Sequence, residues 1–462
     1  MRQPFDPCPE LVLTPIEKIL LPLDSRDELP PILAGLQWLW THPTLKPAVL
    51  ELVRQKVLGD KHLTGRPGMD LWQILVLGVV RLGLDANYDR LEDLANHHTL
   101  LRQMLGLPLL PWSQAAKRFH HQTLRDNVCL VDAALLHEIN ALVAAQGRAV
   151  FATGRAAAPA PLAIKVDTYV LETDVHFPTD LNLLFDAGRK CLDLIEKYRD
   201  QCGYQLPGWR KLADWRARFK AAERVASKVA FGGGKDKEKR VQAAVGDYLR
   251  VGRELARKLT ASLLSLCEQP VNQGDWDGLA YFEQMLDKHL DLVDRRLLQG
   301  QTIPSAEKLF SLFEPHTEWI TKGKLHPGVE LGHRLLVATD QHGLIQDYDE
   351  LIGQVDVDQS LPVAGRLLGR YGEGGIASLS FDKGFTRSAD RELLRLYIPQ
   401  VVMPKRGKKS AAEAAEESTQ PFIALRRQHS AVESDIAALE RMFLLFGMVI
   451  SIGTDSFAAF WP

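Results

Sequence analysis

The stretch SLSFDKGF, Ser378–Phe385, places an aspartate at the end of a short apolar run. Lys383 and Gly384 follow Asp382 directly. A charge at the point where a buried strand ends is costly unless it has a partner. Asp and Gly are also common turn residues, so the stretch alone is compatible with a simple turn. Two hypotheses follow: Asp382 is a turn residue, or it is a carboxylate that binds a metal.

The composition is that of an ordinary globular chain with room for two or three domains: 462 residues, 46% hydrophobic and 25% charged. The net charge of -2 excludes a globally basic nucleic-acid-binding protein but leaves local basic patches open. The five cysteines form no C-x-x-C pair, which is typical of free thiols in a reducing compartment. No apolar signal core begins the chain, and no stretch approaches about 18 apolar residues, so we expect a cytoplasmic protein without a membrane span.

Residues 1–150 have the pattern of a helical domain. DLWQILVLGVVRLGL (Asp70–Leu84) is apolar on most faces, which predicts a buried helix. The stretch after it predicts two short helices joined near Asn96–Thr99. Three short helices in succession are compatible with a helix-turn-helix module, although many bundles share this pattern. An Ala- and Pro-rich segment, Ala152–Ala163, predicts a linker that ends this region.

The rest of the chain predicts an α/β catalytic core with a helical insertion. Residues 151–180 hold the linker and a first strand with Asp167 in its middle, and 181–315 predict long amphipathic helices broken by a Gly-Lys loop at Gly232–Arg240. Residues 316–462 predict a hairpin (His333–Gly353), a helix, the strand that ends at Asp382, a helix, a strand, a surface loop (Lys405–Thr419) and a last helix.

Three acidic residues occupy notable places in this pattern: Asp167, Asp382 and Glu433. A two-metal magnesium site needs several carboxylates that converge on ions about 3.5–4 Å apart. Each residue also has a local alternative. Asp167 could face solvent on an edge strand, Asp382 could form an Asx turn, and Glu433 fits a capping box with Ser430. Their order along an α/β chain predicts that a central sheet brings them together.

The segments around these acids resemble the catalytic motifs of DDE insertion-sequence transposases, most closely the ISNCY type. The similar stretches are VDTYVLETDVHFPTDLNLLFDAGRK, SFDKGF and RRQHSAVESDIAALE, and the D-x-G-[FY] match at Asp382–Phe385 is the most specific. LTGRPGMDLWQILVLGVVRLGLDANYDRLEDLANHHTLLRQMLG resembles the N-terminal DNA-binding region of the same elements. The resemblance covers nearly the whole chain. It implies a ribonuclease H-like core, a mixed sheet flanked by helices, in which two Asp and one Glu bind two Mg²⁺ ions, with Mn²⁺ as a substitute.

The resemblance also implies roles and partners. Asp167 and Asp382 would share the metals and Glu433 would complete the site, so that water and later a DNA 3′-hydroxyl attack phosphodiesters in line. The partners would be double-stranded DNA, both terminal inverted repeats and target, bound by a dimer or higher oligomer of a bacterial, nucleoid-associated protein. Candidate DNA contacts, for which solvated surface charge is the alternative, are Arg66, Arg210, Lys211, Lys383, Lys405, Arg406, Arg426, Arg427 and His429.

The sequence departs from the family in two places. Many of these enzymes carry a Tyr–Arg–Glu–Lys pattern around the third acid; here His429 takes the Arg place and Glu440 the Lys place. Glu440 is therefore a second candidate for the third acid, although RRQHSAVESDI favours Glu433. The final MVISIGTDSFAAFWP is apolar where the family usually continues with a basic helix. A truncated, catalytically defective DNA-binding remnant or repressor is one alternative function, and a two-metal nuclease outside transposition is another.

Overall fold

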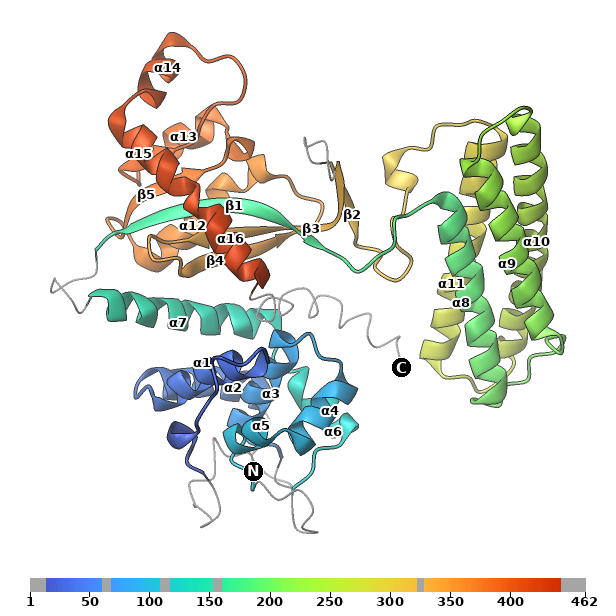
Figure 1. The fold of residues 1–462 in the computed structure, drawn as a ribbon, viewed down its shortest axis with the longest axis horizontal. Helices are drawn as coiled ribbons and strands as arrows, with labels where there is room; N and C mark the ends of the chain where they lie inside the picture. Colours follow the sequence, from blue (N-terminus) through green and yellow to red (C-terminus); the bar gives the residue numbers. More distant parts are fainter. Residues whose placement is uncertain (1–13, 60–67, 109–116, 153–159, 322–327, 442–462) are drawn as a thin grey trace. The chain divides into compact units, whose positions relative to one another are not determined.

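The structure is a computed structural model that describes residues 14–59, 68–108, 117–152, 160–321 and 328–441 (Figure 1). It combines a mixed six-stranded sheet flanked by helices with an N-terminal group of helices and a second group of long helices. Contacts divide the described chain into two units. The first comprises residues up to Tyr169 and from Leu335 onward, and the second comprises Val170–Arg334.

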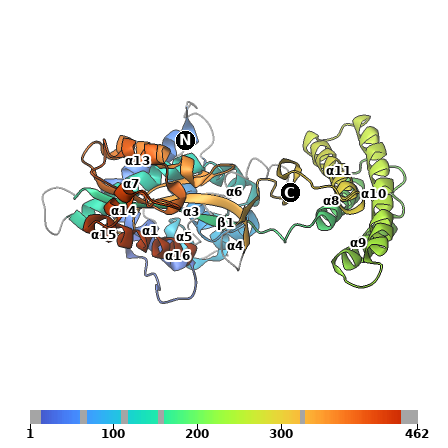
Figure 2. The ribbon, with the colours of Figure 1, turned by 90° about the horizontal axis from the view of Figure 1, so that it is seen from above.

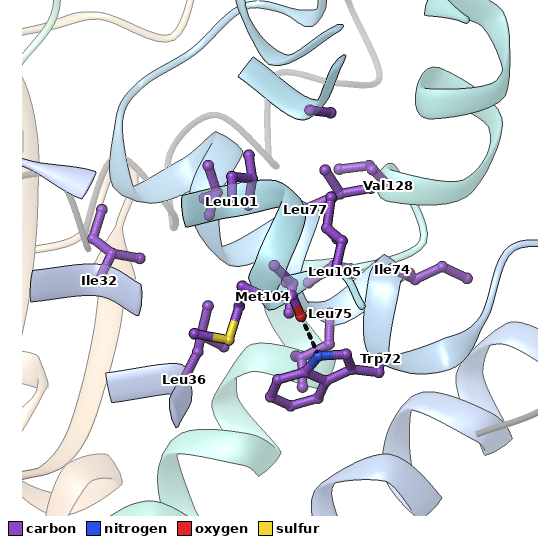
Figure 3. Close-up of a cluster of buried hydrophobic side chains, with 14 of the residues drawn as sticks. Ile32, Leu36, Trp72, Ile74, Leu75, Leu77, Leu101, Met104, Leu105 and Val128 are labelled. Atoms are coloured by element: carbon purple, nitrogen blue, oxygen red, sulfur yellow. Dashed lines mark hydrogen bonds between the residues drawn. The ribbon is translucent and has the colours of Figure 1, made fainter. Parts of the chain in front are cut away.

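The N-terminal helices pack around one apolar core. The helix predicted at Asp70–Leu84 is confirmed as α3 (Leu71–Gly83), and its residues are almost all buried. The Trp72 indole N–H donates a hydrogen bond of 2.9 Å to the Met104 carbonyl, and Leu101 and Leu105 lie in the same cluster (Figure 3). The other helices of this group are α1 (Leu29–Thr41), α2 (Leu45–Leu58), α4 (Tyr88–His97), α5 (Thr99–Met104), α6 (His121–Val128) and α7 (Ala133–Ala152).

Local capping explains the break between α4 and α5. The Asn87 side chain accepts a hydrogen bond from the Arg90 backbone N–H at the start of α4. His98 is extended and its ring nitrogen caps α5 by accepting from the Leu101 N–H. Asn is a favoured N-cap residue because its side chain satisfies an otherwise unpaired backbone donor. The junction therefore falls inside the predicted interval Asn96–Thr99.

Across the described ranges, no single helix is both long and apolar enough to cross a membrane. One bent pair of helices, His121–Val128 with Ala133–Ala149, reaches the required length and composition only when its two members are taken together.

The sheet has the order β2-β3-β1-β5-β6, and β4 pairs with β3. β1 and β5 are parallel neighbours in the interior, β6 is parallel to β5, and β2 is antiparallel to β3. The predicted hairpin is confirmed as β3 and β4, whereas the four-residue edge strand β2 was not predicted. Asp382 therefore follows the fifth strand along the chain and not the fourth. The strands are β1 (Leu162–Glu172), β2 (Glu318–Thr321), β3 (Val329–Thr339), β4 (Ile345–Leu351), β5 (Ile376–Phe381) and β6 (Gln400–Val402).

The central strand β1 has one apolar and one polar face, because successive side chains of a strand point to opposite sides. Ile164 and Val166 belong to the apolar core, which α12 (Ser360–Tyr371) and α13 (Ser388–Leu394) complete. Lys165 and Asp167 alternate with them and so belong to the other face. On that side lie α15 (Gln420–His429), which packs against β5 and β6, and α16 (Ala431–Arg441).

The prediction of a surface loop over Lys405–Thr419 is wrong in part, because the structure contains α14 (Ala411–Glu417) there. Ser410 and Glu413 form a complete capping box at its start. Lys405 forms an ion pair with Glu413 at 2.8 Å, and Lys409 pairs with Glu417 at 2.5 Å. Lys405 and Lys409 thus neutralise glutamates of the helix that follows them in the same segment.

The segment predicted as a helical insertion holds four long helices, α8 (Asp180–Asp200), α9 (Leu212–Phe231), α10 (Lys237–Cys267) and α11 (Gln273–Val293). They lie side by side in both views (Figures 1 and 2) and share an apolar core of their own. Glycine permits a close crossing here, since a Cβ at Gly188 would lie 2.4 Å from the Phe219 ring. The predicted loop Gly232–Arg240 is shorter than expected, because α10 begins at Lys237.

A first prediction concerns the N-terminal core. Trp72→Phe removes the indole N–H that donates to the Met104 carbonyl. Loss of a buried hydrogen-bond partner costs about 1–3 kcal/mol. We expect hydrogen exchange of the α3–α5 amides, measured by mass spectrometry, to report that loss of opening free energy. The control is Trp38→Phe, whose side chain is 42% exposed, with an expected change within about 0.5 kcal/mol. Equal effects of the two substitutions would contradict this account of the core.

Candidate functional site

Asp167 lies in the interior of the sheet, on β1 between β3 and β5. Its side chain is half-buried, and its Oδ1 accepts a hydrogen bond of 2.7 Å from the Thr168 backbone N–H. The alternative of a solvent-facing aspartate on an edge strand is therefore wrong. A carboxylate on a central strand needs compensation from other groups on the same face.

Asp382 comes beside Asp167 through the pairing of the parallel strands, since Val166 is in register with Phe381. The residue is exposed and precedes the short helical turn η5 (Lys383–Phe385), which the Phe385 N–H closes by donating to the Asp382 carbonyl at 3.2 Å. The Asp382 side chain makes no capping hydrogen bond to this turn. The turn predicted from SLSFDKGF thus exists, but it is made by the backbone and leaves the carboxylate available.

Glu433 is exposed in the first turn of α16. The capping-box alternative is wrong, because Ser430 has helical backbone angles and its hydroxyl donates back to the Arg427 carbonyl at 2.6 Å. Val432 and Ile436, on the other side of this helix, are buried. The packing of α16 through Val432 and Ile436 therefore sets the position of Glu433, and Glu433 does not cap the helix.

The electrostatics of Asp167 connect the three predicted acids. Burial is the largest influence and raises its pKa to about 6, opposed by the Thr168 N–H. The negative charges of Asp382, Asp356 and Glu433 raise the pKa further, in that order. The structure thus brings the three predicted acids within electrostatic reach of one another, together with Asp356 as a fourth.

Asp356 was missed from the sequence. It begins the short turn η4 (Asp356–Asp358), which packs against η5. Its Oδ2 lies 3.2 Å from the place where a Cβ on Gly384 would be, so a larger residue at that position would crowd the carboxylate. The only signal in the sequence was the acidic run Asp356-Val-Asp358 before a predicted helix, and nothing in that run connected it with Asp382.

A buried ion pair holds α16 against the polar face of the sheet. Lys165 is only 8% exposed, and its Nζ lies 2.8 Å from Asp435 Oδ2. The Thr339 hydroxyl on β3 donates to the same oxygen at 2.7 Å. Asp435 lies two residues after Glu433, so this contact fixes the helix that carries the third acid.

His429, at the end of α15, lies among these charges. Its Nδ1 is 3.1 Å from the Ser380 hydroxyl on β5. Burial lowers the pKa of His429, and Lys165 acts in the same direction, whereas Asp382 and Glu433 oppose them. The neutral imidazole is therefore favoured. His429 lies near the acids, but as a neutral group it is a weaker partner for phosphate than the positively charged residue that the sequence predicts.

The other predicted DNA contacts are scattered. Lys383 follows Asp382 directly, and Arg426 and Arg427 lie on α15, which precedes the helix of Glu433; all three are exposed. Lys405 is engaged with Glu413, whereas Arg406 beside it is exposed. Arg210 and Lys211 are exposed just before α9 in the second unit, and Arg66 lies outside the described residues. The side chain of Glu440 also lies outside what the structure describes.

The chemistry of the cluster fits a hard divalent cation, because Mg²⁺ and Mn²⁺ prefer carboxylate oxygen. Asp382 and Glu433 are exposed and accessible to an ion, and mutual repulsion already raises the pKa of Asp167. As the side chains stand, no three His, Cys, Asp or Glu residues in the described ranges are close enough together to hold one ion. The donor types fit, while the ligating geometry is not formed in this structure.

Comparison of the chain with protein-family models, curated proteins and solved structures found no match.

The pKa of Asp167 predicts how stability depends on pH. Its value of about 6 lies above the usual 3.8, so the folded protein binds the proton more tightly than the unfolded chain. Stability should therefore fall as pH rises from about 4 to about 6, by up to about 3 kcal/mol, and stay lowered above that. Asp167→Asn removes this loss, so urea unfolding should show the variant more stable than wild type at pH 7.5 and equal at pH 4. A difference that is the same at both pH values would contradict the assignment.

Proposed function

We propose that this chain is a DDE transposase of insertion-sequence type, which cleaves DNA strands at the element ends and joins them to a target. One observation carries the proposal. Asp167, Asp382 and Glu433 come from distant parts of the sequence, yet they gather on one face of the sheet, where Asp382 and Glu433 raise the pKa of Asp167. The D-x-G-F motif at Asp382–Phe385 supplies the second acid of this set.

The arrangement of the strands supports a ribonuclease H-like core as part of the same proposal. The first acid lies on the interior strand β1, and the second follows the parallel strand β5 beside it. Glu433 reaches the same face from the late helix α16, which the Lys165–Asp435 pair anchors. This agrees with the order of strand, hairpin, helix, strand and late helix that the resemblance implies.

In this proposal, Asp167, Asp382 and Glu433 would hold two Mg²⁺ ions, and Asp356 lies near enough to act on Asp167 through its charge. The ions would activate the attacking oxygen and stabilise the leaving oxygen of an in-line displacement. The chain itself contributes position and charge, as is usual in phosphoryl transfer. Lys383, Arg426 and Arg427 would hold the DNA phosphates beside the acids, and the neutral His429 would keep the Ser380 side of the site closed.

The N-terminal helices would bind the terminal inverted repeats, and pairing of two element ends would need at least a dimer. The succession of α3, α4 and α5, three short helices joined by tight caps, supports this use because such a module can present one helix to the major groove.

The central prediction is that Asp382→Asn abolishes cleavage and spares DNA binding. A supercoiled plasmid carrying the candidate terminal repeats, incubated with Mg²⁺ or Mn²⁺, should be cut and joined by the wild type, and the variant should be slower by roughly 1,000-fold or more. The matched control is Asp358→Asn, an exposed aspartate that pairs with Arg387 on the same side of the core, and it should keep wild-type rates.

The outcomes of this assay separate the hypotheses. Strand transfer supports the transposase. Cleavage without joining would identify a metal-dependent nuclease, and DNA binding without cleavage by the wild type would identify a DNA-binding remnant or repressor. Unchanged cleavage by Asp382→Asn would refute the assignment of this carboxylate under any of the three.

A further prediction distinguishes the two candidates for the third acid. Glu433 acts on both Asp167 and His429 through its charge. Glu433→Gln should therefore lower cleavage to the level of Asp382→Asn, whereas Glu440→Gln should retain most of the wild-type rate. The same plasmid assay measures both. The reverse result would assign the role of third acid to Glu440, seven residues after Glu433, and would leave the assignment of Asp167 and Asp382 unchanged.

A further inference from the structure

A row of cations runs along α9 in the second unit. Lys220, Arg224 and Lys228 are spaced by four residues, so they lie on one face of the helix, and all three are exposed. Within the described chain, none of them forms an ion pair. We call these three residues the α9 stripe.

The acids of α9 do not neutralise the stripe. Glu223 is half-buried and accepts a hydrogen bond of 2.7 Å from Ser227, and Asp214 lies more than one turn before Lys220. The exposed positions beside the stripe include Ala217 and Ala221, whose small side chains leave the helix surface open to close approach.

Most of the other arginines of this unit are paired with acids. Eight of them form ion pairs with acids of the same unit: Arg189, Arg199, Arg216, Arg218, Arg250, Arg253, Arg295 and Arg296. Residues 210–240 hold eleven Lys or Arg against four Asp or Glu, in a chain whose net charge is -2. Positive charge is thus concentrated on one segment and left unpaired on one helix face, which is the pattern of a surface for a polyanion.

We propose that the α9 stripe binds the phosphate backbone of double-stranded DNA, without reading its sequence and outside the carboxylate site. At 1.5 Å per residue the stripe is about 12 Å long, and at about 3.4 Å of duplex axis per phosphate of one strand this length covers the axial rise of three to four phosphates. Lys235 in the following turn and Lys237 and Lys239 in the first residues of α10 are also exposed and add positive charge next along the chain. The choice of DNA as the polyanion rests on the proposed function.

The test compares two triple variants of the full chain. Lys220→Ala/Arg224→Ala/Lys228→Ala removes the stripe, and Arg218→Ala/Arg250→Ala/Arg253→Ala removes the same charge from cations that are already paired. Alanine is well tolerated on exposed helix faces, and circular dichroism checks that both variants fold. Binding to a fluorescent random-sequence duplex is measured between 50 and 200 mM salt, in EDTA so that no cleavage occurs.

We expect the stripe variant to bind about tenfold or more weakly at 50 mM salt, with the slope of log affinity against log salt reduced by about 3. The control should keep the wild-type slope within about 1. Equal slopes for both variants, or a loss confined to an RNA duplex, would overturn the proposal. The proposed function is tested separately: it would be refuted if the wild type neither cut nor joined plasmid DNA in Mg²⁺. That result would not change the salt dependence of binding measured in EDTA.

Discussion

The carboxylate site depends on one ion pair, between Lys165 on the central strand and Asp435 on α16. Lys165 is nearly buried, so its charge needs a partner, and removing that partner would leave an uncompensated charge inside the protein. Asp435 supplies the partner, and Thr339 adds a hydrogen bond to the same carboxylate oxygen. Asp435 lies two residues after Glu433 on the same helix. The ion pair that neutralises Lys165 therefore also holds Glu433 on the face of the sheet where Asp167 and Asp382 lie.

Much of the core could be predicted from the sequence, because its signals are local. The Val, Thr, Tyr and Leu residues around Asp167 and the turn residues of His333–Gly353 predict β1 and the β3–β4 hairpin correctly. The failures have different causes. α14 was taken for a loop because its segment is low in apolar residues and mixed in charge, although Ser410 and Glu413 have the S-x-x-E spacing of a capping box. Asp356 was missed because the packing of η4 on η5 brings it to the acids.

The four acids show why a carboxylate cluster is costly to build. Burial on β1 raises the pKa of Asp167, and the like charges of its neighbours raise it further. These charges act on Asp167, although no three His, Cys, Asp or Glu side chains in the described ranges are close enough together to hold one ion. Lys165 is paired with Asp435, which is not one of the four acids. A cluster that lowers stability at neutral pH is typical of a functional site, where a bound cation supplies the missing positive charge.

The helical unit carries a surface of positive charge, whereas the acids lie on the sheet. Its four helices share their own apolar core, so the cations of α9 can change without repacking the sheet that holds the acids. Within that unit, Arg218, Arg250 and Arg253 pair with acids, whereas Lys220, Arg224 and Lys228 on one face of α9 are exposed and form no ion pair in the described part of the chain. Paired cations stabilise a fold modestly, while unpaired ones on one face keep their charge for a polyanion. In the proposed transposase, this division would let DNA binding by α9 and strand cleavage by the acids be adjusted independently.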